Sequence, residues 1–125
     1  MIVGTGIDLV EVPRIAHSIE RFGERFVRRV FTELEIRYCE SRQNRAERYA
    51  ARFAAKEAGL KALGTGLRMG INWRELEVRR NPGQRPTLYL SGRAAGVAAQ
   101  LGARRISLSL SHTEQHAIAQ VILED

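Results

Sequence analysis

Hydrophobic and polar positions divide the first half of the chain into one strand and a series of helices. Residues 2–9 are an apolar run interrupted late by Asp8, which predicts a strand with an acidic position near its end. Apolar residues then recur at helical spacing. They predict helices over residues 13–29 with an interruption near Gly23, residues 33–41 beginning at the capping residue Thr32, and residues 45–63 ended by Gly64 and Gly66.

The second half of the chain is richer in strands than in helices. Its predicted elements are strands over residues 75–80 and 87–90 joined by the turn formers Asn81-Pro82-Gly83-Gln84, a helix over residues 92–101 between Ser91 and Gly102, and a hairpin of strands over residues 106–111 and 117–123. Helices early and antiparallel strands late predict an α+β fold. The length of 125 residues predicts one compact domain, residues 1–125.

Composition narrows the class of protein but not its activity. Cys39 is the only cysteine, so an internal disulfide and a multi-cysteine zinc site are excluded. No stretch has the pattern of a signal peptide or the roughly 20 apolar residues of a membrane span, and we expect a cytoplasmic protein that does not enter membranes. The net charge of +6 predicts an anionic partner, which could be a nucleic acid, a phosphorylated cofactor or an acidic protein.

The longest predicted helix gathers charged residues that could perform chemistry. Arg52 and Lys56 are four residues apart, as are Glu57 and Lys61, so the helix brings a carboxylate and three cations within about three turns. A surface ion pair on an alanine-rich helix would explain the same spacing.

Asp8 makes the chemical interpretation stronger, because an aspartate at the end of an apolar strand needs a partner. It lies too far before Pro13 to be a simple cap of the helix that begins there. Two carboxylates, Asp8 and Glu57, suit a magnesium ion whose other positions are filled by water and phosphate oxygens. Lys56 and Lys61 would then face the phosphates.

A second pattern lies on the predicted helix that starts at Pro13. If that helix is continuous through Gly23, four arginines fall within a sector of about 60°. They are Arg14, Arg21, Arg25 and Arg28. Like charges on one face repel each other and suit an acidic partner, although a solvated amphipathic helix would also explain them.

Two other patterns have ordinary structural explanations. Residues 4–6 (GTG) lack the third glycine of a dinucleotide-binding loop and predict a turn or the start of a strand. His112 and His116 are four apart, but they flank a predicted hairpin, so hydrogen bonding is favoured over a metal site.

Several motifs occur in an order that resembles the holo-acyl-carrier-protein synthase family, the short phosphopantetheinyl transferases. They are GIDLVEV at residues 6–12, Arg14-Ile15, Phe31-Thr32, FAAKEAGLK at residues 53–61, Gly64-Thr65-Gly66 and LSLSHT at residues 108–113. The resemblance covers nearly the whole chain. It implies magnesium-dependent transfer of 4′-phosphopantetheine from coenzyme A to a serine of apo acyl carrier protein, with release of adenosine 3′,5′-bisphosphate.

The resemblance also implies roles for particular residues. Asp8 and Glu57 match the family's metal ligands, Glu57 and Lys61 its catalytic residues, and Lys61 its phosphate-contacting lysine. The positions expected around coenzyme A are Arg52, Lys56, Lys61, Gly64, Pro86 and His112. The arginines of the first helix would dock the acidic carrier protein. A homotrimer is expected, with active sites between subunits.

The turn before Pro86 departs from the family pattern. The family has glycine, a basic residue and proline in sequence, whereas this chain has Gly83-Gln84-Arg85-Pro86. Positive φ at Gln84 would strain the turn and weaken the assignment of Pro86.

Two other functions remain compatible with the charge. They are a basic nucleic-acid-binding domain and a noncatalytic adaptor for an acidic protein. Scattered aromatic residues argue against nucleic acid, since no base-stacking platform is predicted. Magnesium-dependent turnover of coenzyme A would separate the enzyme from both.

Overall fold

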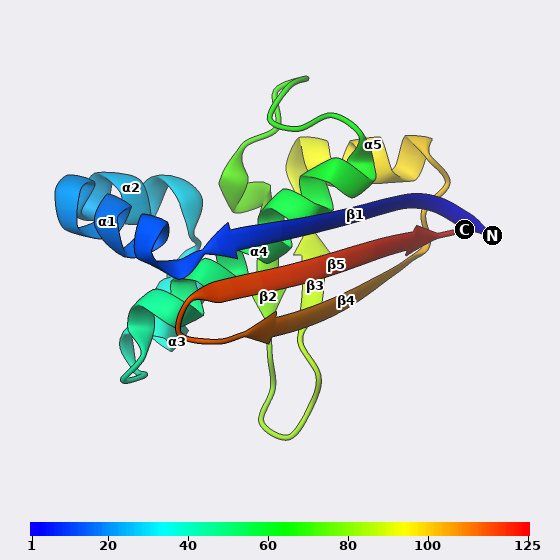
Figure 1. Ribbon diagram of the computed structural model, residues 1–125. Helices are drawn as coiled ribbons and strands as arrows, with labels where there is room; N and C mark the ends of the chain where they lie inside the picture. Colours follow the sequence, from blue (N-terminus) through cyan, green and yellow to red (C-terminus); the bar gives the residue numbers. More distant parts are fainter.

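The long helix α4 (Arg45–Leu63) lies against a three-stranded antiparallel sheet at the centre of the fold (Figure 1). The computed structural model describes all 125 residues. The sheet has the order β1 (Ile2–Glu11), β5 (His116–Glu124) and β4 (Arg105–His112), so the final hairpin pairs with the first strand. The two chain ends therefore lie side by side, and the Met1 ammonium is 2.7 Å from an Asp125 carboxylate oxygen.

Small residues let α4 approach the sheet closely. A Cβ atom on Gly6 would collide with the carbonyl oxygen of Ala58, and one on Gly4 with that of Ala62. Of the two alternatives predicted for residues 4–6, the start of a strand is confirmed and the turn is wrong. Both glycines lie within β1, where the absence of a side chain makes room for the helix.

Helices α1 (Val12–Phe22) and α2 (Glu24–Val30) form one end of the molecule (Figure 1). Gly23 separates them, with φ 55° and ψ −132°, so the predicted interruption is confirmed. Because the helix is not continuous through Gly23, the four arginines do not share the predicted sector of about 60°. Two of the four arginines lie on α1 and two on α2, and their directions no longer follow one helical repeat.

Helix α3 (Glu33–Glu40) begins at Thr32, as predicted. The Thr32 hydroxyl accepts from the Glu35 backbone N–H at 3.3 Å, and Glu35 Oε1 accepts from the Thr32 backbone N–H at 2.9 Å. The side chain of Glu35 is buried, which places a carboxylate inside the protein.

A two-stranded sheet packs on a different face of α4. It pairs β2 (Leu76–Arg79) with β3 (Thr87–Leu90) and is flanked by the 3₁₀ helix η1 (Trp73–Glu75) and by α5 (Gly92–Gln100). Leu76 and Leu88 approach α4 at Gly59. The predicted α+β class is thus confirmed, with strand boundaries within a few residues of those predicted. None of the helices combines the length and apolar sequence that crossing a bilayer requires.

The β2–β3 turn is formed without the strain that positive φ at Gln84 would cause. Gly83 takes the positive φ, 77°, while Gln84 has none and donates its backbone N–H to the Asn81 carbonyl at 3.0 Å. The glycine lies one residue earlier than in the family pattern, and the conformation is formed without strain at Gln84.

Candidate active site

Asp8, Glu57 and Lys61 meet where the end of β1 passes α4. Lys61 Nζ donates to Asp8 Oδ1 at 3.1 Å and to the Ile7 carbonyl at 3.0 Å. The three side chains line a cavity of about 360 Å³, here called the acidic cavity. Its wall also includes Arg14 and the aromatic rings of Phe26 and Phe53. The structure therefore brings together the carboxylates and one lysine that the sequence singled out.

The two carboxylates of the acidic cavity influence each other. Partial burial raises the pKa of Glu57 above the ordinary carboxyl value, and the negative charge of Asp8 raises it further, while Lys61 opposes both effects. A divalent cation between the carboxylates would relieve this repulsion. No group of three or more acidic, histidine or cysteine side chains is placed to hold a metal. Two carboxylates, with water and phosphate oxygens completing the shell, fit magnesium.

Lys56 does not belong to this site, which corrects the prediction that it faces phosphates or contacts coenzyme A. Its side chain is fully buried. Its Nζ is 2.7 Å from Glu35 Oε1 and donates to the carbonyls of Val30, at 2.7 Å, and Trp73, at 3.1 Å. Burial lowers the pKa of Lys56, although the Glu35 carboxylate opposes the shift. All of its donors are directed into the core, so none is left for a ligand.

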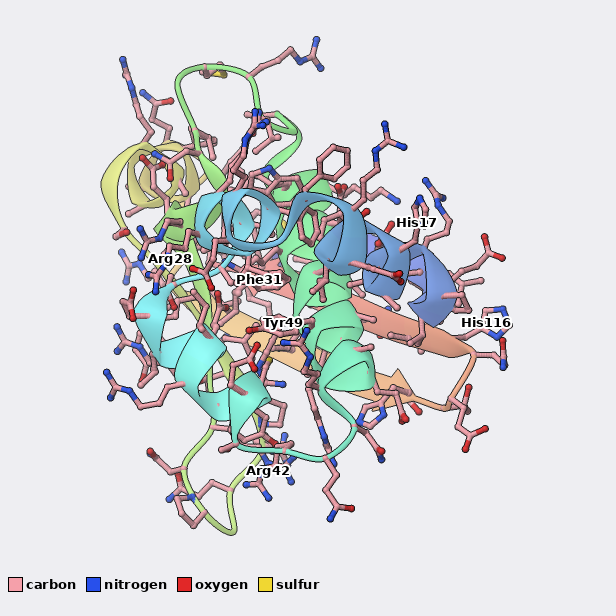
Figure 2. The ribbon with its side chains drawn as sticks, turned by 90° about the vertical axis from the view of Figure 1, so that its left-hand side faces the viewer. His17, Arg28, Phe31, Arg42, Tyr49 and His116 are labelled. Carbon is pink, nitrogen blue, oxygen red and sulfur yellow. The ribbon has the colours of Figure 1, made fainter.

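A second cavity gathers three of the residues predicted to surround coenzyme A. Arg52, Pro86 and His112 line a space of about 170 Å³. We call it the arginine cavity; its remaining walls are Arg48, Ala51, Arg80 and Leu110. A larger hollow of about 510 Å³ shares Arg48 and Arg80 with it and also includes Arg42. Arg42, labelled in Figure 2, lies in the turn that follows α3. Sequence reasoning missed Arg48 and Arg80, although Arg48 lies one helical turn before Arg52.

The arginine cavity contains hydrogen-bond donors without acceptors. Arg48 Nε and Arg52 Nε are buried and have no partner. The Arg52 guanidinium lies over the ring of Tyr38 in α3, with its central carbon 3.9 Å from the ring centre. Unpartnered buried donors are costly, so these groups favour a ligand rich in acceptor oxygens, such as a phosphate.

Gly64 lines neither of the two cavities. It ends α4 in the left-handed conformation, with φ 81°, as the sequence predicted for a helix cap. Its expected contact with coenzyme A remains a prediction.

The four arginines predicted to dock a partner differ in their surroundings. Arg14 lines the acidic cavity, while Arg21 lies over the Phe22 ring at 5.3 Å. Arg25 lines a shallow hollow with Phe26 and other residues of α1 and α2. Arg28, labelled in Figure 2, is paired with Glu24 at 2.6 Å and also with Glu33. Arg28 is therefore the least available for an acidic partner.

Comparison with known proteins places this arrangement in a family. A model described as the 4′-phosphopantetheinyl transferase superfamily matches residues 4–121, and the chain belongs to that superfamily.

Within the superfamily, the chain is similar over its full length to proteins named holo-[acyl-carrier-protein] synthase. It is 64% identical to the one from Koribacter versatilis and 54% identical to that from Solibacter usitatus, with 100% of both chains covered in each case. The Neisseria meningitidis synthase structure has a TM-score of 0.90 at 32% identity, covering 100% of both chains. A Bacillus anthracis synthase in complex with CoA (3′,5′-ADP) has a TM-score of 0.80 at 36% identity, covering 98% of this chain and 96% of the other.

Proposed function

We propose that the protein transfers 4′-phosphopantetheine from coenzyme A to a serine of apo acyl carrier protein and releases adenosine 3′,5′-bisphosphate. The observation that carries this proposal is the meeting of Asp8, Glu57 and Lys61 in one cavity of a chain that belongs to the phosphopantetheinyl transferase superfamily. The names of the similar proteins and the coenzyme A complexes among the similar structures support it.

The residues of the acidic cavity fit phosphoryl transfer. The reaction requires a serine and a diphosphate held in line, with the developing negative charge neutralised. Magnesium bound by Asp8 and Glu57 would supply electrostatic stabilisation of the diphosphate. Lys61 contributes a second positive charge at the same cavity.

The direct test uses the mass of the carrier protein. Apo carrier, coenzyme A and magnesium are incubated with the protein, and the carrier is weighed by mass spectrometry. We expect an increase equal to one phosphopantetheine group, which disappears when magnesium is chelated. An unchanged carrier mass under all conditions would reject the function. Salt-sensitive binding of DNA or RNA without turnover would instead support a nucleic-acid-binding domain.

We also propose a homotrimer whose active sites lie between subunits. The acidic cavity and the arginine cavity share no lining residue, and α4 contributes Glu57 to one and Arg52 to the other. A second copy could bring its arginine cavity to the acidic cavity of the first. The outer sheet face supports assembly, because Ile7, Leu9 and Ile118 are 56%, 64% and 39% exposed there, and Leu9 pairs with Ile118.

Mixed assemblies test the shared site. Glu57→Ala and Arg52→Gln variants, each inactive alone, are unfolded together and refolded as a mixture. If each site takes Glu57 from one chain and Arg52 from its neighbour, random mixing restores about a quarter of the sites. A mixture of Asp8→Ala and Glu57→Ala is the matched control, since both losses fall in the same half-site, and it should stay inactive. Failure of the first mixture to regain activity, or a fully active monomer in light scattering, would reject the proposal.

The exposed arginines of α1 and α2 are proposed to dock the acidic face of the carrier protein. Arg14 supports this most directly, because it lines the cavity that would receive the carrier's serine. Arg21 and Arg25, exposed on α1 and α2, would add positive charge to the docking surface.

A further inference from the structure

His112 is held by partners on both of its ring nitrogens. The residue ends β4 and packs against the first turns of α4. Its Nδ1 is 2.6 Å from Glu47 Oε1, and its Nε2 is 3.3 Å from Arg48 Nη1. The side chains of His112 and Glu47 are 25% and 14% exposed. Both contacts lie at the rim of the arginine cavity, so the state of the imidazole affects any ligand that enters there.

The two contacts determine which nitrogen carries the proton. An arginine guanidinium only donates hydrogen bonds, so His112 Nε2 must accept from Arg48. Nδ1 then carries the hydrogen and donates to the Glu47 carboxylate, which only accepts when ionised. Together the two contacts fit the Nδ1–H tautomer of His112, with the lone pair of Nε2 beside the arginine cavity.

An anion in the arginine cavity would change the partner of Nε2. The charged groups around the ring are Glu47, Arg48 and Arg52 from α4 and Arg80 after β2; its neighbours Leu110 and Ala117 on the sheet are apolar. A phosphate would attract Arg48, whose Nε is already without an acceptor. The bare lone pair of Nε2 would then face phosphate oxygens and repel them. A proton taken from solvent onto Nε2 converts that repulsion into an N–H···O hydrogen bond.

We propose that Glu47 is a positioning residue for the nucleotide half of coenzyme A. It orients His112 through Nδ1, and its negative charge stabilises the imidazolium that forms when a phosphate binds at Nε2. Binding thus takes up one proton from solvent, and departure of the nucleotide product returns it. The identity of the ligand rests on the proposed function, whereas the tautomer of His112 does not.

Calorimetry with adenosine 3′,5′-bisphosphate tests the proton linkage. Titrations from pH 6 to 8.5, in buffers of different ionisation enthalpy, give both the affinity and the number of protons taken up. The phosphate of the ligand itself titrates near pH 6, so the wild type is compared with His112→Gln. Relative to that variant, wild-type affinity should fall with rising pH, by at most about tenfold per unit.

Glu47→Gln tests the positioning role. Glutamine can still accept from Nδ1–H, but it lacks the charge that stabilises the imidazolium. We expect about tenfold weaker nucleotide binding at pH 7.5, little proton uptake there, and a raised KM for coenzyme A with kcat nearly unchanged. Glu40→Gln is the matched control. It removes a carboxylate that contacts Arg45 and Tyr49 but not His112, and its pH profile should equal that of the wild type.

The outcomes distinguish the inference from the proposed function. If the nucleotide binds equally well and with the same pH dependence in the wild type, His112→Gln and Glu47→Gln, the positioning role is wrong while the function stands. If the nucleotide does not bind at any pH, the proposed ligand is wrong and the linkage with it. Nitrogen-15 NMR of the ligand-free wild type provides an independent measurement. It should show the Nδ1–H tautomer at His112, and an Nε2–H tautomer would overturn the inference.

Discussion

Two lysines on α4 have the same chemistry and opposite surroundings. Lys56 and Lys61 are five residues apart, which separates them by about 140° around the helix axis. Lys56 is fully buried and pairs with Glu35, whereas Lys61 is 53% exposed and pairs with Asp8 beside a cavity. The cations that share one helix in the sequence therefore divide into a buried ion pair at Lys56 and a cavity-lining ammonium at Lys61.

The elements that cover each face cause the difference. Helix α3, the end of α2 and η1 close over Lys56 and offer it a carboxylate and two carbonyls. The end of β1 leaves Lys61 open on one side. Residue type and helical spacing cannot distinguish the two environments, because the covering elements come from residues 30–35 and 73, distant from α4 in the sequence.

The largest effect on stability is expected from Lys56→Ala. The substitution leaves the Glu35 carboxylate buried without its cation, and breaking such a pair costs about 3–5 kcal/mol. Urea unfolding of the variant measures this loss. Lys61→Ala removes an exposed ammonium from the same helix and should change the free energy of unfolding by no more than about 0.5 kcal/mol. Equal losses in the two variants would contradict the division between the faces.

Removal of either carboxylate of the acidic cavity is expected to abolish turnover without unfolding the protein. Asp8→Ala and Glu57→Ala should each lower magnesium-dependent transfer by at least about 10²–10³-fold, because each takes away a proposed metal ligand. The transfer rate is measured against magnesium concentration. Glu11→Ala, which removes an exposed carboxylate from the same strand, is the control. Wild-type magnesium dependence in either cavity variant would refute the ligand pair.

Lys61→Ala should reduce the rate of catalysis more than it weakens substrate binding. A cation directed at the reacting phosphate counts most in the transition state, so kcat should fall by about 10²-fold with a smaller change in KM. Steady-state kinetics at saturating coenzyme A and carrier gives both constants. An unchanged kcat would return Lys61 to the role of a surface ion-pair partner of Asp8.

Much of this arrangement could be predicted from local sequence. Helix α4 has the predicted boundaries, the Thr32 cap follows from a Thr-x-x-Glu pattern, and Gly64 ends the helix as expected. The burial of Lys56 depends instead on Glu35, twenty-one positions away, and on backbone carbonyls that carry no sequence signal.

The four arginines of α1 and α2 show a second limit of sequence patterns. They share one sector only on a helix that turns by a uniform 100° per residue, and Gly23, with φ 55°, breaks that helix. The break itself was predictable from Gly23, but the new directions of the residues after it were not. The pairing of Arg28 with Glu33 also crosses from α2 to α3, which helical spacing does not describe.

Carrier docking should depend on the open arginines and less on the paired one. Reversal of both Arg14 and Arg21 to Glu should raise the KM for carrier protein about tenfold and flatten its salt dependence, since such charges steer encounter and are screened by salt. The KM for coenzyme A should change less than the KM for carrier protein, and any change in it comes from Arg14, which lines the acidic cavity. The same reversal at Arg104 and Arg105, exposed near the start of β4, matches the change in net charge and should have a smaller effect.

Arg28→Ala should also have a small effect on the KM for carrier protein, because Glu24 and Glu33 already neutralise that guanidinium. Identical KM values for the two double reversals would leave α1 as a solvated amphipathic helix.

The smallest predicted effect is a gain in stability when Glu57 becomes Gln. Burial and Asp8 raise the pKa of Glu57 in the folded protein above its value in the unfolded chain. Folding therefore favours the protonated form. The cost of the ionised carboxylate is fully present above the folded-state pKa and vanishes below the unfolded-state pKa. Glu57→Gln should consequently raise Tm at pH 7 in the absence of divalent ions, and this advantage over the wild type should shrink as the pH falls toward 4.

Magnesium should stabilise the wild type much more than the Glu57→Gln variant. It should raise the Tm of the wild type by binding the folded state, and have little effect on Glu57→Gln, which lacks one of the two ligands. Thermal unfolding with and without magnesium at both pH values measures these differences. A variant less stable than the wild type at pH 7, or an advantage that does not change with pH, would show that Glu57 is not destabilised in the metal-free fold. The open face of α4 would then differ from the buried face in exposure alone, and the electrostatic argument for a cation between Asp8 and Glu57 would lose its support.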